Sequence, residues 1–71
     1  MWIRSQSLAV LVKANEICIE NKINIWAEGY LIGKYSTEEK ALLVLDILEK
    51  VATCPGNTLF QMPQDDEVDE V

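Results

Sequence analysis

A helix start in the middle of the chain is the feature that most constrains the fold. A helix leaves its first N–H groups without intrahelical partners, and a Ser or Thr hydroxyl just before it can accept a hydrogen bond from one of them. Ser36 with Glu39 matches the Ser-x-x-Glu capping box, and Thr37 is the alternative cap one residue later. We predict a helix from this point to about Thr53, because Pro55 cannot continue the hydrogen-bond ladder.

The residues on either side of this helix have the composition of strands. Residues 2–35 are rich in Ile, Val, Leu, Trp and Tyr and are interrupted by polar pairs. Within residues 8–13 the chain is apolar on both faces, which favours a buried strand, and Ala14-Asn15 after it is either a bulge or a turn. The predicted strands are residues 2–5, 8–13, 16–20, 23–28 and 30–35, with a short final strand at 58–62.

These elements predict an α+β domain. The expected architecture is an antiparallel β-meander of four to five strands, with one helix from the C-terminal half packed on it and a short closing strand. Alternation of side chains constrains the turn after residue 20: a two-residue loop sets Ile19 opposite Asn24, whereas a three-residue loop sets Ile19 opposite Ile23 and keeps one apolar face. We therefore predict the three-residue loop, and a tight hairpin at Glu28-Gly29.

Charge divides the chain into a nearly neutral body and an acidic end. The 71 residues carry a formal net charge of −6, but the last seven, Asp65 to Val71, hold five acids and no base. A run of like charges repels itself and usually stays solvated. We therefore expect a single small domain at residues 1–63 and a disordered acidic tail at residues 64–71.

The expected cellular compartment follows from two features that the sequence does not show, an export signal and a membrane span. The first residues do not resemble an export signal, and the longest apolar run, Leu8 to Val12, is far shorter than a membrane span. We expect a cytoplasmic protein with no membrane association. In that setting Cys18 and Cys54 are expected to be buried or half-buried thiols and not a disulfide.

Residue types also limit the chemistry. The chain has no His, so it has no Ser-His or Cys-His nucleophile pair, and two separated cysteines do not make an ordinary zinc site. No Gly-rich phosphate loop is present, and Glu38 and Glu39 are interpreted as first-turn partners of the helix dipole. We expect no catalytic, cofactor-binding or metal-binding residues, and therefore not an enzyme.

The helix has a wider apolar arc than one sheet needs. The arc covers about 200° where packing on a sheet uses about 100°, and Leu42 lies even within the polar sector. Either a curled sheet and residues 54–62 cover the flanks of the helix, or part of the arc contacts another protein chain. Under the second interpretation the candidate contact residues are Trp26, Leu42, Leu43 and Ile47.

Two function classes follow. The first is a non-catalytic protein-interaction module that self-associates or binds a protein partner. The second is a nucleic-acid-related accessory role, either by base stacking on a sheet bearing Trp26 and Tyr30 or by mimicry of DNA charge by the acidic tail. Direct nucleic-acid binding is disfavoured because the six bases are scattered along the chain.

Two sequence patterns resemble known families. Leu31-x-Gly33-x-Tyr35-x-Thr37-x-Glu39-x-Ala41 resembles a pattern of small DNA-binding domains, the plant ethylene-response type and the arm-binding domains of phage integrases, which combine a three-stranded sheet with a helix. Over nearly the whole chain, the opening MWIRSQ, the middle GKYSTE, the helical AL-x-VLD and the closing FQMP resemble a family of small bacterial and phage proteins with no assigned activity. The first resemblance implies the architecture, and the second implies a phage-borne or mobile-element accessory protein.

Overall fold

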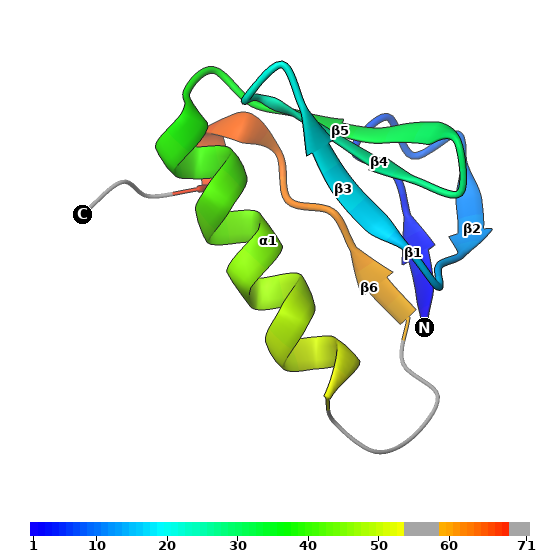
Figure 1. Ribbon diagram of the computed structural model, residues 1–71. Coiled ribbons are helices and arrows are strands. Elements are labelled where there is room, and N and C mark those ends of the chain that lie inside the picture. The colour runs from blue at the N-terminus through cyan, green and yellow to red at the C-terminus, as the bar shows by residue number, and fades with distance from the viewer. Residues whose placement is uncertain (54–58, 69–71) are drawn as a thin grey trace.

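Six strands, one α-helix and one 3-10 turn make up the computed structural model, which describes residues 1–53 and 59–68 (Figure 1). Two three-stranded sheets have the strand orders β2-β1-β6 and β3-β4-β5. The α+β class with one packed helix is confirmed. The elements are β1 (Trp2–Arg4), β2 (Leu11–Lys13), β3 (Ile17–Glu20), β4 (Asn24–Ala27), β5 (Tyr30–Lys34), α1 (Glu38–Ala52), β6 (Leu59–Gln61) and the 3-10 turn η1 (Asp65–Glu67).

The strands form two sheets instead of one continuous meander. β3, β4 and β5 are an antiparallel meander, as expected, but β1 and β2 form a hairpin of their own. β6 joins that hairpin parallel to β1, with Ile3 opposite Phe60. The sequence predicts either a bulge or a turn at Ala14-Asn15. These two residues belong to the short connection between β2 and β3, which leads from one sheet to the other.

The predicted buried strand at residues 8–13 is wrong in its first half. Leu8 lies in the turn after β1 with a positive φ of 69°, and its N–H donates to the Ser5 carbonyl at 2.9 Å. The strand proper is Leu11–Lys13, in which Val12 is buried and Leu11 is exposed. The run is therefore buried on one face only, because one side of this sheet is open to solvent.

The loop between β3 and β4 contains three residues, as predicted. Glu20 pairs with Asn24, so residues 21–23 form the loop. The pairing is two residues further along than expected: Ile19 lies opposite Ile25 instead of Ile23. A shift of two preserves the face of every side chain, so the common apolar face survives. The hairpin at Glu28-Gly29 is also confirmed, since both residues have positive φ, 52° and 82°.

Thr37, and not Ser36, caps helix α1. The Thr37 hydroxyl accepts a hydrogen bond from the Lys40 N–H at 3.2 Å, while the Ser36 N–H donates to Asp65. The helix ends at Ala52, and the Thr53 N–H donates to the Glu49 carbonyl at 3.2 Å. Pro55, the expected terminator, lies outside the described residues.

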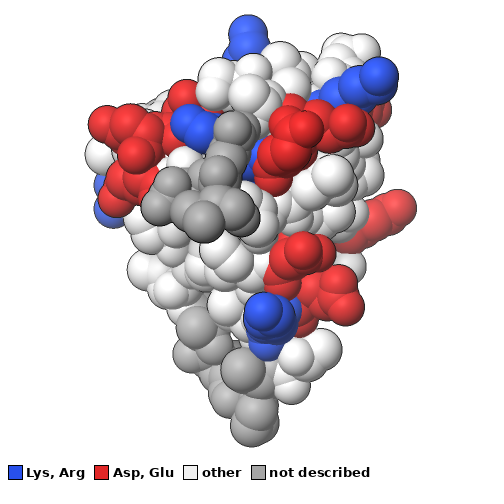
Figure 2. Space-filling view, turned by 90° about the vertical axis from the view of Figure 1, so that its left-hand side faces the viewer, with Lys and Arg blue, Asp and Glu red and all other residues white. Residues whose placement is uncertain are grey.

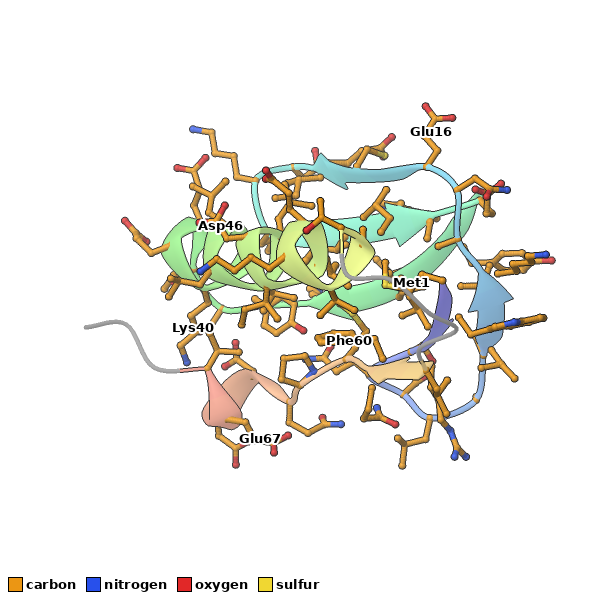
Figure 3. All side chains as sticks on the ribbon, turned by 90° about the horizontal axis from the view of Figure 1, so that it is seen from below. Met1, Glu16, Lys40, Asp46, Phe60 and Glu67 are labelled. Atoms are coloured by element: carbon orange, nitrogen blue, oxygen red, sulfur yellow. The ribbon has the colours of Figure 1, made fainter. Side chains whose placement is uncertain are left out.

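The helix packs its inner side against the sheets. Ala41, Val44 and Leu48, spaced three and four residues apart, are its buried residues. In Figure 3, which views the molecule from below, Phe60 points from β6 toward this helix. The core residues are Ile3, Val12, Ala14, Ile25, Ala27, Ile32, Tyr35, Ala41, Val44, Leu48 and Met62.

Gln6 joins the two sheets. Its N–H donates to the Ile32 carbonyl at 2.7 Å, and its side-chain Oε1 accepts from the Lys34 N–H at 2.9 Å. These two bonds satisfy the edge of β5 in the way that another strand would. The Gln6 carbonyl accepts from the Gln64 Nε2 at 2.7 Å, and the Gln6 Nε2 donates to the Pro63 carbonyl at 3.4 Å. The segments MWIRSQ and FQMP therefore lie next to each other around Gln6.

The sequence predicts a disordered acidic tail over residues 64–71, and in the structure residues 64–68 of this segment contact the body of the chain. An Asp65 carboxylate oxygen accepts from the Ser36 N–H at 2.7 Å, and this bond, followed by the charge of Lys40, lowers the pKa of Asp65. The Lys40 ammonium donates to the Asp65 carbonyl at 2.9 Å and lies 3.5 Å from its carboxylate. Figure 3 shows Lys40 extending from the helix toward η1. Residues 69–71 lie outside the described residues.

Candidate functional site

The structure does not bring the four predicted contact residues together. Leu43 and Ile47 are one helical turn apart and are both exposed, so they form a ridge. Leu42 is also exposed but lies about 100° around the helix axis from Leu43. Trp26 is half-buried on β4, on the opposite face from Ile25, which is buried in the core. Trp26 therefore faces away from the helix.

Helix α1 carries four of the seven acids of residues 1–63, and two of them lie on its outer side. Here we use the term helix outer face for the exposed residues Glu39, Leu42, Leu43, Asp46 and Ile47. Glu38 and Glu49 flank this face, and Lys50 is the one base exposed on the helix. Figure 2 shows this side of the molecule, with red acidic groups separated by white uncharged surface. The described part of the closing segment, β6, pairs with β1. It leaves Leu42, Leu43 and Ile47 of the helix exposed.

A second exposed surface lies on the β2-β1-β6 sheet, and sequence reasoning missed it. Trp2 is 43% exposed and has Lys13 on one side and Leu59, 62% exposed, on the other. The next row of the same face has Arg4 between Leu11 and Gln61. We call these residues the basic sheet face: Trp2, Arg4, Leu11, Lys13, Leu59 and Gln61.

The charge of the basic sheet face is of one sign. Its two charged residues, Arg4 and Lys13, are both basic, and β1, β2 and β6 contain no acid. The overall net charge is −6, so the acids lie elsewhere in the chain. The signal was present in the alternation Trp2-Ile3-Arg4, which places an aromatic and a base on one side of a strand. This signal is hidden because the apolar run at residues 8–13 predicts a strand buried on both faces.

Leu8 extends this surface at a conformational cost. A non-glycine residue in the left-handed region costs about 1–2 kcal/mol, and a leucine has no polar group that would offset it. Leu8 has a φ of 69° and is 52% exposed, while its carbonyl accepts from the Arg4 Nε at 3.1 Å. Leu8 is therefore a strained, exposed apolar residue in contact with Arg4 of the basic sheet face.

The outer side of the other sheet forms a shallow hollow. Its volume is about 420 Å³, and its lining residues are Glu16, Cys18, Glu20, Trp26, Glu28 and Gly29. The backbone N–H groups of Asn15 and Glu16 donate to the Glu28 carboxylate at 2.8 and 2.9 Å and lower its pKa. Glu28 therefore orders the connection between the sheets. Cys18 is exposed here, which corrects its assignment as a buried or half-buried thiol. Cys54 lies outside the described residues.

Among the described residues, few polar side chains are placed where they could react with a substrate or bind a metal ion. Tyr35, the most deeply buried phenol, donates to the Pro63 carbonyl at 2.8 Å, and burial followed by the charges of Asp65 and Glu67 raises its pKa. Its hydroxyl therefore has a structural role. In residues 1–53 and 59–68, no three Cys, Asp or Glu side chains are grouped as a metal site. Over the same residues, α1 is too short and too polar to cross a bilayer.

Comparison with protein-family models, with curated proteins and with solved structures finds no match to this chain. The candidate site therefore depends on the geometry of the exposed surfaces alone.

Proposed function

We propose that this chain is a small, non-catalytic protein-interaction module that binds through the basic sheet face. The observation that supports this proposal is the position of Trp2. It lies on the central strand of its sheet, with strands paired on both sides, and it is nevertheless 43% exposed. A central strand is where a small domain can most easily bury a tryptophan, so an exposed one there indicates a binding surface.

The apolar area on this face is large enough to contribute to binding. A large aromatic residue carries about 150–250 Å² of surface, so the exposed fraction of Trp2 leaves on the order of 100 Å² in water. At about 25 cal/mol per Å², covering that surface alone is worth roughly 2.5 kcal/mol. Leu59 and Leu11, 62% and 59% exposed, add to the same patch.

A protein partner suits this face better than a nucleic acid. A face that offers Arg4 and Lys13 as its charges reaches few phosphates, whereas nucleic-acid binding gains most of its affinity from many such contacts. Tail mimicry of DNA charge is supported less, because Asp65 already binds Ser36 and Lys40 of its own chain. Apolar residues around two bases fit an acidic protein surface with an apolar centre.

The test compares matched surface variants. The double variant Trp2→Ser/Leu11→Ser removes apolar groups from the basic sheet face, and Leu31→Ser removes an exposed leucine from the other sheet. Each protein is immobilised and exposed to a lysate of the source cells, and bound proteins are identified by mass spectrometry. We expect wild type and Leu31→Ser to recover a common set that the double variant loses. Recovery of the same set by all three would refute the proposal.

Leu8→Gly gives a second test that is independent of folding. Glycine accepts a positive φ without strain but has more backbone entropy to lose, so we expect stability to be unchanged or raised by up to about 1 kcal/mol. Binding should weaken because the exposed leucine is lost. Thermal unfolding gives the stability, and the same capture assay gives the binding. Undiminished capture by Leu8→Gly would show that this turn is outside the contact surface.

A further inference from the structure

We infer that the partner of the basic sheet face is the helix outer face of a second copy of this chain, so that copies associate head to tail. This inference deepens the proposed function and depends on it. It assigns an occupant to two exposed apolar surfaces, the basic sheet face and the helix outer face, which are otherwise unrelated parts of one molecule. Both surfaces expose apolar side chains, and their charged residues are of opposite sign.

The two faces are complementary in charge. The basic sheet face holds Arg4 and Lys13 within strands that contain no acid. The helix outer face holds Glu39 and Asp46, with two more acids, Glu38 and Glu49, beside it and one exposed base, Lys50, in the last turn, so this side of the helix is acidic in net charge. Opposite charges across an interface favour one pairing and disfavour the pairing of either face with itself, because two basic faces or two acidic faces would repel.

The two faces are also complementary in apolar content. The sheet face presents Trp2, Leu11 and Leu59, and the helix presents the ridge of Leu43 and Ile47. An α-helix with exposed residues one turn apart is a convex ridge, whereas a three-stranded sheet with long side chains at its sides offers a broad platform. Packing the ridge on the platform removes apolar groups of both copies from water.

The two faces point away from each other within one molecule. In β1, Ile3 is buried toward the core while its neighbours Trp2 and Arg4 are exposed on the opposite side of the sheet. In α1 the buried residues, including Val44, lie on the side of the helix opposite the middle of the outer face. A copy bound at one face therefore leaves the other face free. Such a contact repeats and yields a chain or a ring in place of a closed two-fold dimer.

The experiment uses two variants that each lose one face. Trp2→Ser/Lys13→Glu alters the basic sheet face, and Leu43→Ser/Asp46→Lys alters the helix outer face; all four residues are exposed. Leu31→Ser is the matched control on the unrelated sheet. Far-UV circular dichroism and thermal melts first establish that each protein is folded. Sedimentation equilibrium over a wide concentration range then gives the mass of each variant alone and of the two mixed in equal amounts.

Head-to-tail pairing predicts a specific pattern. Wild type and Leu31→Ser exceed twice the 8.0 kDa chain mass as concentration rises, and added salt lowers that mass. Each face variant alone stays at the chain mass. Their mixture reaches twice the chain mass and no more, because one intact sheet face meets one intact helix face and both remaining faces are blocked.

Other outcomes overturn the inference in distinguishable ways. A dimer formed by the helix variant alone would show that the sheet face pairs with itself, which leaves the proposed function intact and removes the head-to-tail pairing. A wild type that stays at 8.0 kDa at all concentrations refutes self-association. In that case the lysate capture by Trp2→Ser/Leu11→Ser still decides whether the sheet face binds a different protein. A mixture that remains monomeric while wild type associates also refutes the pairing.

Discussion

Substitution of Gln6 tests whether one side chain holds the two sheets together. In Gln6→Ala the backbone bond from residue 6 to Ile32 remains, but the 2.9 Å bond from the Lys34 N–H and the 3.4 Å bond to Pro63 are lost. The first bond has ordinary length and the second is long, so we count one full hydrogen bond, worth about 1 kcal/mol. Gln6→Glu keeps the acceptor for Lys34 and loses only the long bond, so its loss should be smaller.

Two measurements check this prediction. In urea, a loss of about 1 kcal/mol with a slope near 1 kcal/mol per molar lowers the unfolding midpoint by roughly 1 M, with Gln6→Glu between wild type and Gln6→Ala. Native-state hydrogen exchange provides the local assay. The Lys34 amide should exchange faster in Gln6→Ala, while the Tyr35 amide, bonded to Ile23 at 3.0 Å, serves as the internal control.

If the Lys34 amide keeps its protection in Gln6→Ala relative to the Tyr35 amide, the side chain does not complete the edge of β5. A midpoint within experimental error of wild type would lead to the same conclusion for the global stability. Either result would show that the backbone bond from Gln6 to Ile32 and the shared apolar core are sufficient to hold the sheets in place.

Three further outcomes follow from the described contacts. Thr37→Ala should lower the free energy of unfolding by about 1 kcal/mol and Ser36→Ala by much less, since only the Thr37 hydroxyl caps α1; urea titration of both decides it. Leu48→Ala should cost about 2–5 kcal/mol and Leu42→Ala less than about 0.5, because Leu48 is buried and Leu42 exposed; equal midpoints for the two would contradict the packing. Asp65 has a pKa below its unfolded value of about 3.9, so its contribution is present above that pH and is lost as the pH falls through the lowered pKa. Wild type should therefore exceed Asp65→Asn in stability at pH 7 and converge with it in acid, and a constant difference in melting temperature from pH 7 to pH 2 would argue against the docking of η1.

Local signals predicted the elements that depend on neighbouring residues. The helix start was read correctly to within one residue, because hydroxyl caps and first-turn acids act over three or four positions. The hairpin at Glu28-Gly29 was predictable because glycine takes a positive φ easily. The length of the loop before β4 was predictable from the alternation of side chains. Its exact register was not, because a shift of two residues leaves every face unchanged.

The features that the sequence did not reveal depend on residues far apart in the chain. Pairing of Ile3 with Phe60 leaves no local pattern in either strand. The role of Gln6 is equally hidden, since a single polar residue after a strand is ordinary until Lys34 lies beside it. Docking of Asp65 could not be inferred from a run of acids, because its partners are one backbone N–H of Ser36 and the ammonium of Lys40. The part of the basic sheet face on β6 was missed for the same reason, since Leu59 and Gln61 join this face only through pairing with β1.

The parallel pairing of β1 with β6 has a consequence during synthesis. β1 leaves the ribosome before α1, yet its second neighbour, β6, is made only after the whole of α1. Until β6 emerges, the nascent chain exposes one open edge of β1, and the domain cannot complete its fold stepwise from the N-terminus. Such a distant closure slows folding relative to a helical protein of the same size. A stalled or prematurely terminated translation product would therefore expose an unpaired, aggregation-prone strand edge, which chaperones and proteases would recognise.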